Sequence, residues 1–152
     1  MGFFQLRTEQ QVNASLEEVW TFISSPKNLK EITPDHMGFK ITNQVSGNMY
    51  PGMIISYKVS PLLGIKMNWV TEITHVKDME YFVDEQRIGP YTMWHHEHHL
   101  EENEHGVLMK DIVSYQPPFG ILGNLANSLF IKKQLIEIFD YREEAVDRYF
   151  EK

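Results

Sequence analysis

The hydrophobic pattern begins with a two-residue period at the N-terminus. Phe4, Leu6, Thr8, Gln10 and Val12 alternate with more polar neighbours. Because successive side chains of a strand point to opposite faces, this alternation predicts a β-strand with one apolar face.

A short helix is predicted directly after this strand. Ser15 and Glu18 fit a capping box, with Ser at the N-cap and Glu three residues later. Apolar residues follow at helical spacing, namely Leu16, Val19, Trp20 and Ile23. Pro26 should end this helix, and a second short helix is predicted over 27–32, before Pro34.

Strand signals dominate from there to residue 116. The predicted strands are 39–45, 53–60, 65–76, 81–87, 91–101 and 107–115. The breaks between them are rich in Gly, Pro, Asn and Asp, which are turn residues. Short turns at regular spacing predict an antiparallel meander.

The last third of the chain returns to helical spacing and predicts one long helix over 122–150, about 40 Å in length. Its expected apolar stripe is Leu122, Leu125, Leu129, Ile136, Phe139, Val146 and Phe150. The predicted fold class is therefore α+β. We expect a curved antiparallel β-sheet wrapped around a long C-terminal helix, with two short helices after the first strand, in a single domain spanning 1–152.

Composition narrows the possible functions. The chain has 152 residues, a net charge of −7 and no cysteine. The missing thiols exclude disulfides, a cysteine nucleophile and cysteine metal sites, and the negative charge argues against nucleic acid as a partner. With no long apolar run and no signal-peptide pattern, we expect a cytoplasmic protein without stable membrane insertion.

Four segments carry a resemblance to a known family. They are 14–20 (A-S-L-E-E-V-W), 82–100 (F-x-D-x-Q-x-x-G-P-Y-x-x-W-x-H-x-H-x-L), 109–120 (M-x-D-x-V-x-Y-x-x-P-x-G) and 138–142 (I-F-x-Y-R). Together they resemble the START-like or SRPBCC superfamily, which has a helix-grip fold. They are most similar to a bacterial, polyketide-cyclase-like branch of ligand-binding members, in which Phe is usual at the position of Leu100. The resemblance implies a cavity between sheet and helix that holds an apolar or amphipathic small molecule. We expect no cofactor.

Strand alternation selects the side chains for such a cavity. In 91–101 it places Trp94, His96, His98 and Leu100 on the inner face, and His95 and His99 on the outer face. If Leu100 lies opposite Val107, His96 lies opposite Asp111 on the neighbouring strand. The predicted ligand-binding residues are Met67, Trp69, Phe82, Asp84, Gln86, Trp94, His96, His98, Met109, Asp111 and Tyr115.

The polar members of this set have three interpretations. They form a hydrogen-bonded network that fixes the strands, they orient a ligand, or His96 or His98 acts as a general base with Asp111 or Asp84 fixing its tautomer. Three functions stay open. The first is binding of a small hydrophobic or amphipathic ligand, lipid- or polyketide-like as the resemblance implies; the others are a cyclase or dehydratase activity that uses a His/Asp pair as general base, and a protein-interaction module with a filled cavity. Alternation splits the four histidines into an inner and an outer pair. Either pair could support a metal, and Asp111 or Asp84 could supply a further ligand, but we expect no physiological metal site. The sequence leaves the ligand and the oligomeric state open.

Overall fold

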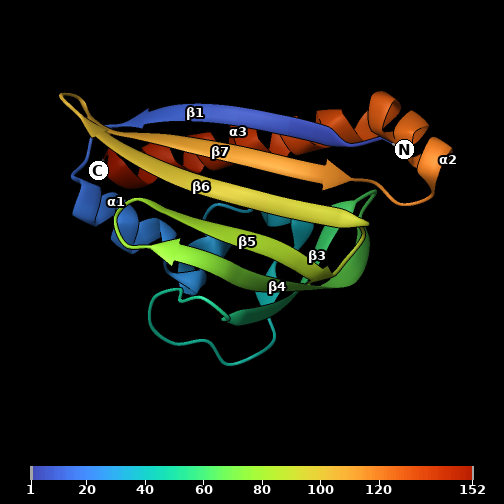
Figure 1. Ribbon diagram of the computed structural model, residues 1–152, viewed down its shortest axis with the longest axis horizontal. Coiled ribbons are helices and arrows are strands. Elements are labelled where there is room, and N and C mark those ends of the chain that lie inside the picture. The colour runs from blue at the N-terminus through green and yellow to red at the C-terminus, as the bar shows by residue number, and fades with distance from the viewer. Residues whose placement is uncertain (1, 152) are drawn as a thin grey trace.

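The computed structural model describes residues 2–151 and contains a seven-stranded antiparallel sheet in the order β1-β7-β6-β5-β4-β3-β2 (Figure 1). Strands β2 to β7 form a meander, and β1 pairs with β7. The strands are β1 Phe4–Val12, β2 Lys40–Ile41, β3 Ile54–Leu62, β4 Ile65–Lys77, β5 Tyr81–Ile88, β6 Met93–Asn103 and β7 Gly106–Gln116.

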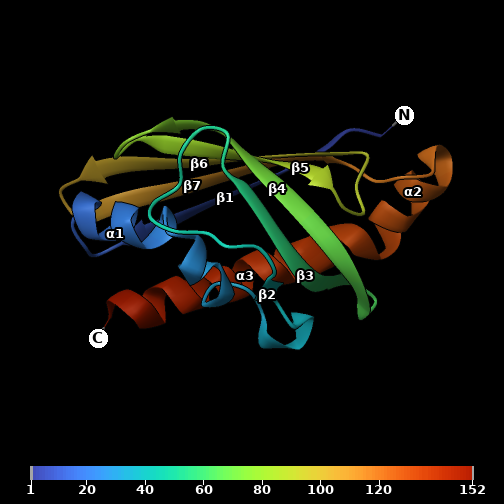
Figure 2. The same ribbon diagram turned by 90° about the horizontal axis from the view of Figure 1, so that it is seen from below.

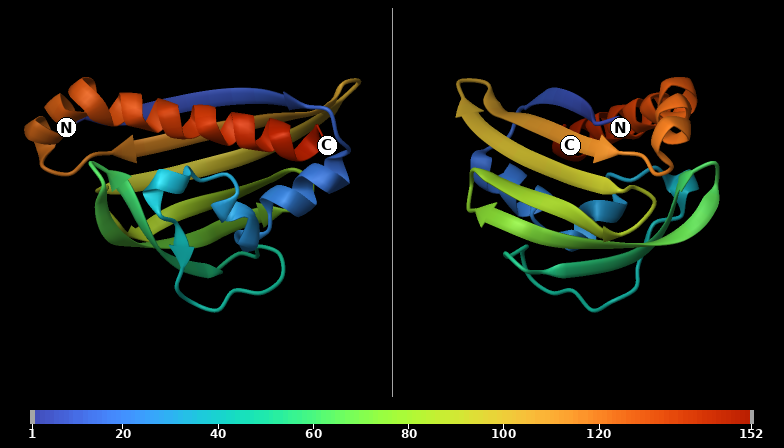
Figure 3. Two further views of the ribbon diagram at one scale, coloured as in Figure 1. Left: turned by 180° about the vertical axis from the view of Figure 1, so that it is seen from behind. Right: turned by 45° about the vertical axis from the view of Figure 1, so that its right-hand side comes forward.

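The helices lie on the inner face of this sheet. After β1 come α1 Leu16–Ile23 and two 3-10 helices, η1 Pro26–Lys30 and η2 Asp35–Met37. The C-terminal helix is continuous and consists of α2 Gly120–Ala126, a π-helical turn η3 Asn127–Ile131 and α3 Lys132–Phe150. Figure 2 shows α3 running along the sheet, and Figure 3 shows the sheet curling around it. This is a helix-grip architecture, as the sequence predicted.

Local sequence signals account for most element boundaries. The capping box at Ser15 and Glu18 is present, with Glu18 Oε2 accepting from Ser15 N at 2.9 Å. The strand predicted over 39–45 is only two residues long, because the side chain of Asn43 binds the carbonyl of Ile54 and the N–H of Ser56 and so replaces the ladder. The second predicted helix is a 3-10 helix rather than an α-helix.

The register expected between the two histidine-containing hairpin strands is wrong by two residues. Leu100 lies opposite Met109 rather than Val107, and His98, not His96, lies opposite Asp111. A shift of two residues leaves every side chain on its predicted face, since side-chain direction alternates with period two. His96 and His98 are accordingly buried.

A tight turn causes this shift. Asn103 pairs with Gly106, so that only two residues connect the strands, and Asn103 Oδ1 accepts a hydrogen bond from the N–H of His105 at 2.9 Å. Gly106 has a φ of 113°, and a Cβ there would overlap the carbonyl oxygen of Val12. Only glycine fits this position without strain.

The apolar stripe predicted for the C-terminal helix is wrong in its first half. Leu122, Leu125 and Leu129 are 72%, 57% and 69% exposed, and Ile136 is 38% exposed. The inner face instead carries Gly123, Asn127, Ile131, Leu135, Phe139, Arg142, Ala145 and Val146.

Two contacts and the π turn set this different face. A Cβ at Gly123 would overlap the carbonyl oxygen of Pro118, so this residue must face the preceding loop. Tyr115 donates a hydrogen bond to Asn127 Oδ1 at 2.8 Å and turns that polar side chain inward. The π turn adds a residue to the helical period and brings Ile131 and Leu135 into line with Asn127.

The core consists of two apolar clusters. One joins α1 to the sheet around Trp20, Phe22 and Phe82, and the other contains Trp69, Tyr115 and Phe139. No helix within residues 2–151 is long and apolar enough to cross a membrane.

The revised helix face can be tested with a matched pair of leucines. Leu135→Ala removes a buried side chain, and we expect it to lower the free energy of unfolding by about 2–5 kcal/mol. Leu129→Ser lies on the exposed face and should change it by less than about 0.5 kcal/mol. Urea denaturation followed by circular dichroism measures both. Equal losses of stability in the two variants would contradict the buried face that the structure shows and support the apolar stripe predicted from the sequence.

Candidate functional site

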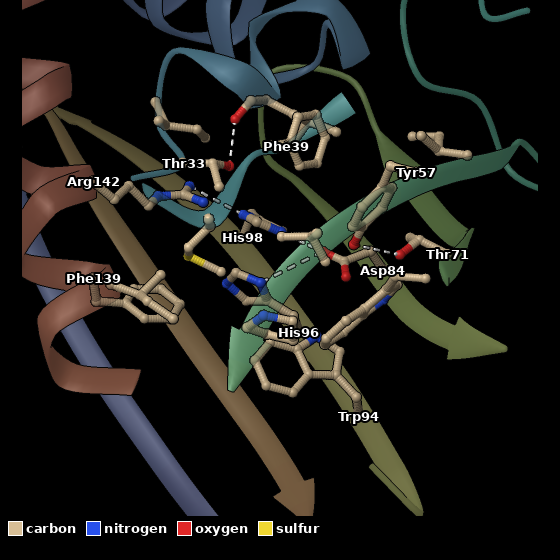
Figure 4. A pocket seen from close by; sticks show the side chains of 18 of the residues that line it. Thr33, Phe39, Tyr57, Thr71, Asp84, Trp94, His96, His98, Phe139 and Arg142 are labelled. Carbon is tan, nitrogen blue, oxygen red and sulfur yellow. Dashed lines mark hydrogen bonds and ion pairs between the residues drawn. The ribbon is translucent and has the colours of Figure 1, made fainter. Parts of the chain in front are cut away.

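A cavity of about 160 Å³ lies between the sheet and α3. Its wall comes from β3, β4, β5, β6 and α3, with Leu29 of η1 and Met37 of η2 on one side. The wall is mostly apolar and rich in aromatic rings, namely Phe39, Tyr57, Trp69, Phe82, Tyr91, Trp94 and Phe139. Its polar members include Thr33, Thr71, Asp84, His96, His98 and Arg142 (Figure 4).

Four charged or titratable side chains of the sheet meet beside this cavity. Asp84 comes from β5, His96 and His98 from β6, and Asp111 from β7. His98 is held on both ring nitrogens, by Asp84 Oδ2 at 2.7 Å from Nε2 and by Asp111 Oδ1 at 3.0 Å from Nδ1. His96 Nε2 lies 2.9 Å from the same Asp111 oxygen, and its Nδ1 lies 3.5 Å from Asp84 Oδ2.

Arg142 of α3 completes this group. Its Nη2 lies 3.2 Å from Asp111 Oδ1, and the side chain is only 10% exposed. The same atom lies 3.3 Å from His98 Nδ1, but that nitrogen has a shorter contact with Asp111, which is therefore its hydrogen-bond partner. We call Asp84, His96, His98, Asp111 and Arg142 the ionic cluster.

The ionic cluster determines which of its groups are charged. Burial alone would raise the pKa of the Asp111 carboxyl, but the guanidinium of Arg142 and the hydrogen bonds from both imidazoles hold it well below its ordinary value. Burial likewise opposes ionisation of Asp84, and the two imidazoles overcome it, so its pKa is also lowered. Both carboxyls are therefore ionised near neutral pH.

The two histidines respond in opposite directions. Burial lowers the pKa of both, but for His98 the hydrogen bonds to Asp111 and Asp84 outweigh burial and raise the pKa above its ordinary value. For His96, burial and the nearby His98 prevail and the pKa is lowered. With His98 charged and His96 neutral, two cations balance two anions, which removes most of the cost of burying charge.

Stacking connects the ionic cluster to both apolar clusters. The His98 ring stacks on Phe82 at 4.0 Å, and the two imidazoles lie 3.7 Å apart. Phe139 of α3 covers His96 from the other side at 5.5 Å. The imidazoles are therefore held rigidly as part of the cavity wall.

One wall residue has an unpaired polar atom. Of the three buried side-chain atoms without a hydrogen-bond partner in residues 2–151, only Trp69 Nε1 belongs to a cavity-lining residue. Tyr57 on the same wall is paired with Thr71 at 3.3 Å, and burial raises the pKa of its hydroxyl far above its ordinary value. Trp69 Nε1 is thus a buried N–H donor without a partner on a residue of the aromatic wall.

The structure places six of the predicted ligand-binding residues on the cavity wall. They are Trp69, Phe82, Asp84, Trp94, His96 and His98. Asp111 belongs to the ionic cluster but does not line the cavity, because both imidazoles lie in front of it.

The other four predicted residues lie away from the cavity. Gln86 clamps the backbone N–H and C=O of Tyr91 at 3.1 and 2.7 Å, and Tyr115 bonds to Asn127. Met109 packs in the α1-side core, and Met67 is only partly buried. None of them lines the cavity.

Sequence reasoning missed Arg142, Tyr57, Thr71, Tyr91 and Phe139 as wall residues. Arg142 had a usable signal, since it follows the predicted inward residue Phe139 by three positions and so shares its helical face. Tyr57 and Tyr91 had no such signal in the sequence, because their positions on the cavity wall depend on how far the sheet curls.

Comparison with known proteins identifies the fold. No family model matches the chain, and no curated protein matches its sequence. Protein CV1439 from Chromobacterium violaceum is similar in structure, with a TM-score of 0.75 at 12% identity, over 97% of this chain and 98% of that one. The crystal structure of Ara h 8.0201 matches at a TM-score of 0.59 and 15% identity, over 95% of this chain and 98% of that one.

A third similar structure is the di-domain ARO/CYC StfQ from the steffimycin biosynthetic pathway. It matches at a TM-score of 0.73 and 11% identity, over 98% of this chain and 51% of StfQ. At such identities the similarity shows the fold alone, and this is the helix-grip fold that the sequence resemblance implied. The narrower bacterial branch stays a prediction.

Replacing the cation from α3 tests whether the ionic cluster holds the helix on the sheet. Arg142→Met leaves Asp111 buried with one cation fewer, and we expect it to lower the free energy of unfolding by about 3–5 kcal/mol. Arg148→Met is the control on the same helix, because Arg148 is exposed and pairs with Glu144 at 3.7 Å. It should change stability by less than about 1 kcal/mol in urea denaturation. Equal effects would show that Arg142 does not anchor the helix.

Proposed function

We propose that the cavity binds a small hydrophobic or amphipathic molecule between the sheet and α3. The observation that carries this proposal is the unpaired Trp69 N–H in a mostly apolar wall rich in aromatic rings. A buried donor without a partner costs about 1–3 kcal/mol, which a ligand oxygen would recover. Apolar walls with few polar groups are the usual composition of small-molecule sites.

The volume favours a compact ligand. A cavity of about 150 Å³ accommodates benzene, so about 160 Å³ suits a molecule of one or two small rings. A lipid or a multi-ring polyketide, the ligand classes suggested by the family resemblance, would enter only if the wall moved or part of the molecule stayed outside. A void of this size also favours binding over an interaction module with a filled interior.

A compact phenol or aryl ketone fits the wall chemistry. Its ring would lie against Trp69, Trp94 and Tyr91, which pack on one another with centroids 5.0–5.9 Å apart. A carbonyl oxygen would accept from Trp69 Nε1, and a hydroxyl would donate to Asp84. With about ten non-hydrogen atoms, such a ligand would bind with a dissociation constant in the micromolar range or weaker.

A cyclase-type enzyme is the second candidate, favoured by the Asp111–His96 pair at 2.9 Å and by the structural similarity to StfQ. Asp111 would fix the imidazole, as in a general-base dyad. His98 is a poor base, because both of its ring nitrogens already donate to carboxylates. Enzymatic activity would therefore depend on His96, and His96→Gln should remove it while His95→Gln on the outer face should not.

Ligand binding can be tested with 4-hydroxyacetophenone, which carries one ring, a carbonyl and a hydroxyl. We expect it to quench the tryptophan fluorescence of the protein, since Trp69 and Trp94 line the cavity. Trp69→Phe keeps the aromatic wall but removes the N–H, and should weaken binding about tenfold by titration calorimetry. Trp20→Phe, in the core away from the cavity, is the control and should leave the affinity unchanged.

Palmitate serves as the long-chain comparison. We expect it to bind more weakly than the phenol, because the cavity is too small for its chain. Absence of quenching by any compact phenol or ketone at millimolar concentration would contradict the proposal.

A further inference from the structure

Three atoms of the ionic cluster converge on one point beside the cavity. They are Asp84 Oδ2, His98 Nε2 and His96 Nδ1, which all lie within 4.8 Å of one another. The carboxylate oxygen is 2.7 Å from the first nitrogen and 3.5 Å from the second. Figure 4 shows Asp84 lying beside the His96 and His98 rings.

The opposite nitrogens of both rings share one outer carboxylate. His96 Nε2 lies 2.9 Å and His98 Nδ1 lies 3.0 Å from Asp111 Oδ1. This is the arrangement seen behind histidines that bind metals, where a carboxylate accepts the far N–H and fixes the tautomer. It directs the Nδ1 lone pair of neutral His96 at Asp84, and His98 would direct the lone pair of Nε2 there once a metal ion displaced the proton on that nitrogen.

This arrangement leaves the contact between His96 Nδ1 and Asp84 Oδ2 without a hydrogen bond. When His96 donates from Nε2 to Asp111, its Nδ1 has a lone pair and no hydrogen. That lone pair faces the negative oxygen of Asp84 at 3.5 Å, and two acceptors then oppose each other in a buried place. A cation between them would turn this repulsion into two bonds.

We propose that Asp84, His96 and His98 bind a divalent transition metal ion, with zinc the ion that this donor set suits. Two ligands about 2.0–2.1 Å from a tetrahedral zinc lie about 3.4 Å apart. The carboxylate oxygen is 2.7 and 3.5 Å from the two nitrogens and all three atoms lie within 4.8 Å of one another, so Asp84 must move away from His98 to admit the ion. Two imidazoles and one carboxylate also form the ligand set of several catalytic metal sites.

Charge and access bear on the same site. A divalent cation would displace the proton of His98 while Arg142 stays paired with Asp111 on the far side of the rings, so that two carboxylates face three positive charges and the site keeps one positive charge for an anionic oxygen. Because the three ligands line the cavity, the remaining coordination position faces its interior. An oxygen of a molecule bound in the cavity would occupy this open coordination position. This part of the inference rests on the proposed function. The metal site itself does not, and it departs from the expectation drawn from the sequence.

The test uses cobalt as a coloured probe. The protein is purified without metal-affinity resin, stripped with a chelator and titrated with Co²⁺ alone. We expect one equivalent to bind with the strong visible absorption of a tetrahedral or five-coordinate site, and one equivalent of Zn²⁺ to abolish that absorption. A folded wild-type protein that binds neither ion at micromolar concentration would overturn the proposal without any variant.

The chain supplies a matched control for surface binding. His95 and His99 lie on the outer face of the same strand, paired with Glu85 at 2.8 Å and Glu97 at 2.9 Å. The double variant H95Q/H99Q should keep the cobalt spectrum and affinity. H96Q and H98Q should each weaken binding at least about 100-fold, and D111N should weaken it about 10–100-fold by loosening the rings.

Two further results separate the possible outcomes. D84N keeps the shape of the Asp84 side chain and should weaken cobalt binding as much as H98Q does. It replaces the histidine variants as the test if circular dichroism shows that they do not fold. Loss of binding only in H95Q/H99Q would mean an adventitious surface site and would overturn the inference. Binding of 4-hydroxyacetophenone to the chelated protein is measured separately, so failure of the metal site and failure of the ligand site are distinguishable.

Discussion

The buried charge of Asp111 is the constraint on which the rest of the structure depends. A carboxylate at 7% exposure must have cationic partners, and here they come from β6 and α3. Asp84 of β5 joins through the same histidine. One set of contacts therefore connects three neighbouring strands and the C-terminal helix, and it fixes where the helix lies on the sheet.

The same constraint explains why the interior is hollow where it is. The two apolar clusters fill the ends of the space under the sheet, and the ionic cluster lies between them. Side chains that must keep their ion pairs cannot turn to fill the neighbouring volume. A cavity of about 160 Å³ with an aromatic wall remains beside them. The site is thus rigid on its polar side, which suits binding in a fixed orientation.

Ion pairing also limits which chemistry the wall can perform. His98 uses both ring nitrogens to hold carboxylates, whereas His96 keeps one nitrogen directed at Asp84. A proton, a metal ion or a ligand donor at that nitrogen would each satisfy it. Binding, general-base catalysis and metal coordination therefore compete for one atom, and the choice among them decides whether the protein is a carrier or an enzyme.

The sequence by itself determined the order of elements and the inward face of β6. Both follow from local periodicity, and period two put His96 and His98 inside even though the assumed register was wrong by two residues. Tertiary structure decided the rest. The tight turn at Gly106 set the register, contacts at Gly123 and Asn127 chose the buried helix face, and the curl of the sheet brought Arg142 against Asp111. Local periodicity reports which way a side chain points, but only the packed elements determine what it meets there.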